Sequence, residues 1–154
     1  MRTEPEVSIL ISTYDQLALT RRCLKALEAT LSGKLSYEIL LVDDASSDET
    51  AEYLGNLGGP HRVFLNDERK GFAANNNFAA SQAKGMYLCL LNNDVFVKGD
   101  WLLPMLELLK DDEGAGMIGN VQKLHRTGRY DHMGIVFSPQ GVPRHYLPVK
   151  PLPS

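Results

Sequence analysis

The chain has 154 residues, of which 44% are hydrophobic and 23% are charged. That length fits one domain with a core of its own, and the composition is ordinary for a globular protein. The net charge of −3 gives no basic field, so nothing here favours nucleic acid as a partner. No apolar run approaches the roughly 18 residues of a membrane span, and the N-terminus lacks a signal-peptide pattern. We therefore expect the chain in the cytoplasm, either free or at the inner face of the membrane.

The two cysteines, Cys23 and Cys89, lie far apart in the sequence, sit within apolar patterns and form no CxxC motif. This placement predicts two buried, reduced thiols. A disulfide or a metal-binding role is the alternative.

The first two thirds of the chain alternate predicted strands and helices. Apolar and β-branched runs predict strands over residues 7–13, 37–42, 62–66 and 87–91. Apolar residues at helical spacing predict helices over 16–31, 47–57 and 101–110, and an alanine-rich segment predicts another after Gly71. The alternation predicts an α/β fold with a mostly parallel sheet and helices on both faces.

Side chains that could cap these helices precede three of them. Asp15 and Asp100 stand before the helices that begin near residues 16 and 101. Ser46 and Glu49 have the spacing of a capping box ahead of the second helix.

The regular alternation ends after about residue 110. Residues 115–124 and 134–137 predict two more strands with no helix between them. From Ser138 on, five prolines predict an extended tail. We therefore predict one domain over residues 1–137 and a proline-rich extended tail over residues 138–154.

Four polar clusters follow the predicted strands or strand-linked loops. They are Tyr14-Asp15, Asp43-Asp44, the loop before Gly71, and Asn92 to Asp94. Ligands bind at the carboxyl ends of the strands in such sheets, so we expect the clusters to gather along one edge. The oxygens of Asn92 to Asp94 suit a hard divalent cation, and a simple turn is the alternative.

Three consecutive asparagines, residues 75–77, fall near the predicted start of the alanine-rich helix. Asparagine is a poor interior helix former, so these side chains could present donors to an anionic phosphate at the helix N-terminus. An extended cap with solvated amides explains them equally well.

Four motifs, in this order and spacing, resemble the nucleotide-sugar-binding half of glycosyltransferase family 2, which has the GT-A fold. The motifs are VSILISTYDQ, EILLVDDASSDET, NDERKGFAANNN and GMYLCLLNNDVFV. The NND triplet and the segment RYDHMGIVF resemble an inverting bacterial branch that includes rhamnosyltransferases. The resemblance implies sugar transfer from a UDP- or dTDP-sugar to a saccharide or lipid-linked acceptor, in cell-wall or polysaccharide biosynthesis.

The resemblance also implies roles for residues that bind the nucleotide. Ser12, Thr13 and Tyr14 would line the base and the ribose. Asp44 would accept a hydrogen bond from the imide N–H of uracil or thymine, since a carboxylate only accepts. Gly71 and Asn76 fall where the family approaches the nucleotide and the diphosphate. Many members carry arginine at the position of Asn76, so this chain has one cation fewer there.

Asp94 matches the last acid of the family's DxD motif, which holds Mg²⁺ or Mn²⁺ against the diphosphate. Asn92 replaces the first acid, and Asn92 and Asn93 would contact the nucleotide or a metal-bound water. An amide adds no charge, so the resemblance implies weaker metal binding than two carboxylates give.

An inverting transferase also needs a general base for the acceptor hydroxyl. The family's acid lies in a downstream glycine-rich strand ending in Asp-Glu, which this sequence lacks. Asp131 and His132 are the nearby candidates, and His132 is expected rather to pack or to line the acceptor side. Residues 138–154 would then begin a missing acceptor-side segment.

Two other functions compete with sugar transfer. One is a non-catalytic nucleotide-sugar-binding or scaffold module that lacks the acceptor half. The other is a nucleotidyltransferase of related fold, which would offer a glycine-rich basic loop after the first strand. The segment STYDQLALTRR contains no glycine, so the nucleotidyltransferase is the weakest of the hypotheses.

Overall fold

The computed structural model describes residues 4–31, 33, 35–132 and 134–146. It forms two compact units, Met1–Gly99 (unit 1) and Asp100–Ser154 (unit 2). Among the helices that these described ranges contain, none is long and apolar enough to cross a membrane.

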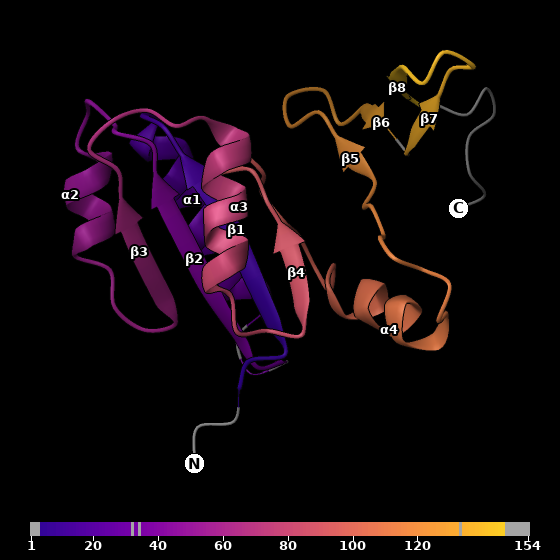
Figure 1. Cartoon of the computed structure of the whole chain (residues 1–154), viewed down its shortest axis with the longest axis horizontal. Coiled ribbons are helices and arrows are strands. Elements are labelled where there is room, and N and C mark those ends of the chain that lie inside the picture. The colour runs from indigo at the N-terminus through magenta and orange to yellow at the C-terminus, as the bar shows by residue number, and fades with distance from the viewer. Residues whose placement is uncertain (1–3, 32, 34, 133, 147–154) are drawn as a thin grey trace. The chain divides into compact units, whose positions relative to one another are not determined.

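Unit 1 is built around a four-stranded parallel sheet in the order β3-β2-β1-β4 (Figure 1). Its strands are β1 Val7–Thr13, β2 Tyr37–Asp43, β3 His61–Leu65 and β4 Tyr87–Leu90. The helices between them are α1 Leu17–Leu31, α2 Thr50–Gly55 and α3 Phe72–Gln82. Because all four strands run the same way, their carboxyl ends lie along one edge of the sheet.

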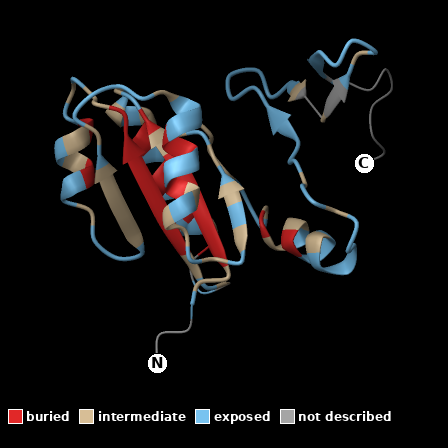
Figure 2. Ribbon diagram, in the orientation of Figure 1, coloured by how far each residue is buried: buried red, intermediate tan, exposed pale blue. Residues whose placement is uncertain are grey.

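The core of unit 1 lies on the two central strands, which are almost wholly buried (Figure 2). Leu10, Leu40 and Val42 pack against Ala79 of α3, where the small alanine lets the helix lie close to the sheet. Ile9 alternates with Leu10 along β1 and points to the opposite face, where Figure 1 draws α1. Helices on both faces confirm the predicted α/β architecture.

Unit 2 holds one helix, α4 Leu103–Asp111, and two short antiparallel pairs. Strand β5 Gln122–Lys123 pairs with β6 Tyr130–His132, and β7 Ile135–Phe137 pairs with β8 Pro143–His145. The strand predicted over residues 115–124 therefore shrinks to two residues. The prediction of an extended tail from Ser138 was also wrong in part, since the Ser138 N–H donates to the Val142 carbonyl at 2.9 Å and closes a hairpin. Residues 147–154 of the predicted tail lie outside the described residues.

Helix α4 starts at a different residue from the predicted one. Its N-cap is Leu102, without a side-chain cap hydrogen bond, so the predicted cap at Asp100 is wrong. Pro104 lies in the first turn, where a missing N–H costs nothing because that group has no intrahelical partner. Leu102 and Leu106 form its buried side.

Gly85 lies close to the backbone of β1 at the amino end of the sheet, and this close approach can be tested. Its N–H donates to the Ser8 hydroxyl at 2.8 Å, and an added Cβ would lie 2.5 Å from the Ser8 nitrogen and 2.7 Å from the Val7 carbonyl carbon. Backbone atoms cannot yield cheaply, so Gly85→Ala should lower the free energy of unfolding by about 1–3 kcal/mol in urea titrations. Gly55→Ala, whose Cβ meets no atom within 4 Å, is the control and should show no such loss. Equal stability of the two variants would contradict the close approach of β1.

Candidate functional site

The polar clusters that follow the strands do gather along the carboxyl edge of the sheet. The loops after β1, β2 and β3 are joined there by side-chain hydrogen bonds, and the turn after β4 begins beside β1, where the Leu91 N–H donates to the Leu10 carbonyl at 3.0 Å. The clustering predicted from the sequence is therefore confirmed. What each cluster does at the edge depends on its partners.

Asp43, the last residue of β2, holds the loop that follows it. The residue is 1% exposed, and its Oδ1 accepts hydrogen bonds from the Thr13 hydroxyl at 3.2 Å and the Ser46 hydroxyl at 2.5 Å. Its Oδ2 accepts from the Ser46 N–H at 2.9 Å. Asp43 thus holds the β2–α2 loop against the end of β1, and the Thr13 hydroxyl is engaged in this contact.

The loops after β1 and β2 lock together through a further exchange of hydrogen bonds. The Asp15 N–H donates to the Ser46 hydroxyl at 2.8 Å, and the Asp15 carboxylate accepts from the Ser47 N–H at 2.7 Å. The N-terminal Leu17 N–H of α1 donates to the Asp48 carboxylate at 3.2 Å. Asp48, rather than the predicted Asp15, is therefore the side chain that caps α1.

The predicted capping box of α2 is also wrong. The helix begins at Thr50, and Glu49 at its N-cap makes no side-chain cap hydrogen bond. The Thr50 N–H donates instead to Asp48 Oδ1 at 2.9 Å, while the Ser46 hydroxyl is already bound by Asp43. One loop carboxylate thus serves the starts of two helices.

Asp44 holds the loop of residues 66–71 that leads from β3 into α3. The residue is 3% exposed, and it accepts hydrogen bonds from the Lys70 N–H at 2.7 Å and the Gly71 N–H at 3.1 Å. Burial raises the pKa of this carboxyl, but the amides of Lys70 and Gly71 and two asparagine side chains outweigh it and leave the pKa below its ordinary value of 3.8. The loop is therefore fixed by an ionised, buried carboxylate.

Asn75 connects that loop to the end of β1. It is 1% exposed, its Nδ2 donates to the Ser12 hydroxyl at 3.0 Å, and its Oδ1 accepts from the Asn66 side chain at 2.9 Å. Asn76 is 6% exposed and donates to the Phe72 carbonyl at 2.8 Å, whereas Asn77 is exposed. Two of the three amides are thus bound inside the protein, which rules out a fully solvated cap.

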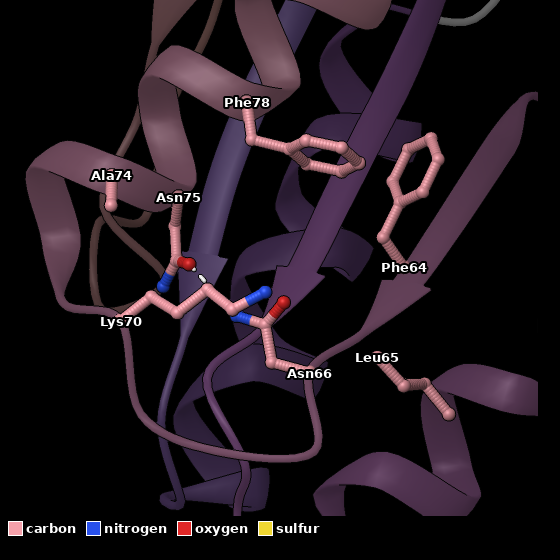
Figure 3. Close-up of a pocket in the computed structure, with 7 residues that line it drawn as sticks. All are labelled: Phe64, Leu65, Asn66, Lys70, Ala74, Asn75 and Phe78. Atoms are coloured by element: carbon pink, nitrogen blue, oxygen red, sulfur yellow. Dashed lines mark hydrogen bonds between the residues drawn. The ribbon is translucent and has the colours of Figure 1, made fainter.

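An open pocket of about 300 Å³ lies between β3 and α3 on the far side of this asparagine pair (Figure 3). At one end the rings of Phe64 and Phe78 meet edge to face, with centroids 5.0 Å apart. At the other end Lys70 extends beside Asn66 and Asn75, as Figure 3 shows. Lys70 and Asn66 also donate hydrogen bonds to Asp44, and Asn75 is bonded to Asn66. The pocket therefore adjoins the loop of residues 66–71 that Asp44 holds.

Tyr14 and Arg69 form the exposed part of the edge. Tyr14 is 37% exposed, and the guanidinium carbon of Arg69 lies 3.7 Å from the centroid of its ring. The Arg69 Nε lies 3.7 Å from Asp44 Oδ2, and the arginine side chain is 60% exposed. This contact brings the loops after β1 and β3 together over Asp44.

The triplet Asn92 to Asp94 forms a turn, closed by the Val95 N–H donating to the Asn92 carbonyl at 3.3 Å. The Asn93 side chain donates to the Thr20 hydroxyl of α1 at 3.1 Å, which fixes the middle of the turn. Asp94 is exposed. Burial, followed by the negative charge of Asp94, raises the pKa of the Cys23 thiol to about 12. The charge of Asp94 therefore lies near α1, and Cys23 stays a neutral thiol.

Cys23 and Cys89 are both free thiols, as predicted, but only Cys23 is buried, since Cys89 is half-buried. Burial alone raises the pKa of Cys89 to about 12. Neither thiol is therefore ready to ionise and bind a metal.

A cation at Asp94 would have to take most of its ligands from a bound molecule. Within the described ranges, no three His, Cys, Asp or Glu side chains come together to hold a metal ion. Mg²⁺ and similar hard cations are commonly held by one or two carboxylates together with substrate phosphates and waters. One exposed carboxylate at a strand end fits that kind of site and does not fit a closed protein cage.

The two candidate bases lie in unit 2. Asp131 is half-buried in β6. The side chain of His132 lies outside what the structure describes. A role as base stays a prediction for both residues.

A family model described as glycosyl transferase family 2 matches residues 8–146. The chain belongs to glycosyl transferase family 2. Its likeness to the crystal structure of TarS from S. aureus, with a TM-score of 0.61 and 20% identity over 69% of this chain, confirms the GT-A type of fold. The rhamnosyltransferase-like branch within family 2 stays a prediction.

Curated relatives of this family 2 domain are much longer than the chain. The chain is 34% identical over 151 residues to the uncharacterized protein y4gI of Sinorhizobium fredii, covering 94% of this chain and 16% of that protein. It is 30% identical over 138 residues to the glycosyltransferase AglE of Haloferax volcanii, covering 84% of this chain and 45% of AglE. The match to TarS covers 20% of the TarS chain. The chain thus spans less than half the length of these proteins.

The sequence placed Asp43, Asn75 and the loop before Gly71 among the polar clusters, but it did not predict that Asp43, Asn66, Arg69 and Asn75 hold the edge together. One signal was available for Asn75, because Asn75 and Ala79 lie four residues apart and so share one face of α3. Nothing comparable marks Asn66 or Arg69, whose partners lie in other loops and in α3.

The pKa of Asp44 leads to a prediction about stability and pH. Because the pKa is lower in the folded chain, ionised Asp44 stabilises the fold above pH 3.8, and this stabilisation is lost as the pH falls through the folded pKa. Asp44→Asn should therefore lower the unfolding free energy by about 1–3 kcal/mol at pH 7, measured in urea. The deficit should shrink steadily below pH 3.8.

The control for this prediction is Asp67→Asn, an exposed aspartate in the same loop. It should leave the unfolding free energy unchanged at pH 7 and also below pH 3.8. A deficit of Asp44→Asn that does not depend on pH would show that its charge is not what fixes the loop.

Proposed function

We propose that this chain is the donor-binding domain of a metal-dependent, inverting glycosyltransferase that uses a UDP- or dTDP-sugar. The observation that carries the proposal is the carboxyl edge of a family 2 domain, where an exposed tyrosine ring, a buried carboxylate and an exposed carboxylate follow three strands. Membership of glycosyl transferase family 2 and the likeness to the glycosyltransferase AglE support sugar transfer as the reaction class.

In this proposal the nucleoside binds at the end of β1. Tyr14 is exposed enough to stack on a base, and Ser12 lies beside it, held by Asn75. Asp44 accepts from the imide N–H of uracil or thymine through the part of its carboxylate that the loop amides leave open. Thr13 supports the proposed nucleoside site indirectly, because its hydroxyl donates to Asp43 and so fixes the end of β1.

The diphosphate is proposed to lie between Gly71 and the turn of residues 92–94. The backbone of Gly71 has φ 86° and ψ 162°, a region that glycine adopts without strain, so phosphate oxygens can approach closely. Asn76 has one amide hydrogen committed to Phe72, which leaves the other for an oxygen. Mg²⁺ or Mn²⁺ held by Asp94 would neutralise charge on the leaving diphosphate.

Asn92 and Asn93 hold the metal-binding turn in shape. The Asn92 carbonyl closes the turn and accepts from the Cys23 thiol at 3.6 Å, and the Asn93 amide is bound to Thr20. Their remaining polar atoms are proposed to meet ribose or a metal-bound water.

Transfer with inversion breaks the bond between the anomeric carbon and the diphosphate oxygen while an acceptor hydroxyl attacks the opposite face of the sugar. The hydroxyl proton goes to a general base, for which Asp131 and His132 are the candidates in this chain. A saccharide or a lipid-linked saccharide is the proposed acceptor. A nucleotide-sugar-binding module without turnover is the competing function, because the chain spans less than half of its relatives.

Titration calorimetry of the chain with UDP and Mn²⁺ tests the proposal. The wild-type chain should bind UDP more tightly with Mn²⁺ than without it, and Asp94→Asn should abolish the metal-dependent gain. Because Asp94 is exposed, the melting temperature should stay within about 1 °C of wild type. Asp111→Asn, another exposed aspartate, is the matched control and should keep the gain.

If neither UDP nor dTDP binds in the presence of Mn²⁺, the proposed function is wrong. Equal metal dependence of UDP binding in wild type and Asp94→Asn would show that Asp94 does not hold the metal. Hydrolysis of a UDP-sugar by the chain would rule out the non-catalytic module.

A further inference from the structure

We infer that Arg69 occupies the base site in the ligand-free chain and that an incoming base must displace it. The inference rests on the proposed function, since it concerns the same Tyr14 and Asp44. The guanidinium carbon of Arg69 lies 3.7 Å from the centroid of the Tyr14 ring, a stacking distance. The Nε of the same side chain lies 3.7 Å from Asp44 Oδ2.

The acceptor capacity of Asp44 explains why Arg69 and a base compete. Oδ1 already faces three donors, the N–H groups of Lys70 and Gly71 and the side chain of Asn66, at 2.7, 3.3 and 3.4 Å. Oδ2 accepts from the Gly71 N–H at 3.1 Å, and the Asn75 side chain is a further donor to the carboxylate, so little of its acceptor capacity is left. The Arg69 Nε lies 3.7 Å from Oδ2. An imide N–H that binds Asp44 therefore takes the place of the arginine.

The ring of Tyr14 imposes the same competition. Tyr14 is 37% exposed, and Arg69 lies over the ring at a distance that leaves no room for a base between them. A base stacked on that face and a guanidinium on that face exclude one another. Displacing Arg69 thus frees both the stacking surface and the hydrogen-bond acceptor that a uracil or thymine would use.

Arg69 can leave without unfolding the loop that carries it. Its side chain is 60% exposed, so the guanidinium exchanges its two contacts for water. The main chain of the loop is held independently, because the N–H groups of Lys70 and Gly71 stay bonded to Asp44. Arg69 is therefore a side-chain plug on a fixed loop, which lowers the affinity of the site for any base.

Binding of uridine to the wild-type chain and to Arg69→Ala tests the plug. Uridine is neutral, so the loss of a positive charge does not itself change its affinity. Removing the competing stacking and ion-pair contacts should tighten uridine binding roughly threefold to tenfold, measured by titration of amide NMR signals. Arg21→Ala is the matched control, because Arg21 lies 4.5 Å over the Tyr53 ring outside the proposed site, and it should leave the affinity unchanged.

A second readout follows the side chain directly. In the free wild-type chain the Tyr14 ring should shield the Arg69 side-chain methylene protons, and saturation with uridine should remove that shielding. Uridine that binds Arg69→Ala no more tightly than wild type, or that leaves the shielding in place, would overturn the plug and leave the proposed function standing. Failure of both proteins to bind uridine, UDP or dTDP would overturn the proposed function as well.

Discussion

Two adjacent aspartates at the end of β2, Asp43 and Asp44, are buried, and the shape of the carboxyl edge follows from how the chain supplies hydrogen-bond donors to their side chains. A buried charge is tolerated only when hydrogen bonds replace the water it has lost. Asp43 takes its donors from the end of β1 and from the loop after β2, and Asp44 takes its donors from the loop after β3. Three loops that are distant in the sequence are thereby fixed around one pair of residues.

This arrangement divides the acids of the edge into two classes. Asp43 and Asp44 are 1% and 3% exposed and act first as anchors, whereas Asp94 is exposed on a turn whose other two residues hold it in place. An exposed acid can bind a cation, but one carboxylate binds it weakly. We therefore expect metal and nucleotide diphosphate to bind together, each supplying ligands or charge that the other lacks.

The parts of the fold that follow from local patterns were predictable. The β-branched run of β1 and the alternation with helices predict a parallel sheet, and the parallel direction predicts that the polar strand ends meet. The hydrogen-bond partners of those strand ends were not predictable, because they lie far away in the sequence. Asp48 caps α1, Asp15 accepts from Ser47 in the next loop, and Asp44 bonds residues 26 and 27 positions away. Such contacts depend on register and loop geometry, which composition and periodicity do not encode. In unit 2 the strand predicted over residues 134–137 is confirmed as β7, whereas β5, β6 and β8 could not be predicted in their observed bounds, since strands of two or three residues carry too little periodicity to be recognised.

The central claim is that a divalent cation and a nucleoside diphosphate meet at the turn after β4. Mn²⁺ broadens the NMR signals of nearby amides, so a titration of the chain with trace Mn²⁺ in the presence of UDP locates the ion directly. We predict that the amides of residues 93–95 broaden first and that those of Lys84 and Gly85, at the amino end of the same strand, stay sharp. Broadening centred elsewhere in the chain, or the same pattern in Asp94→Asn, would contradict it.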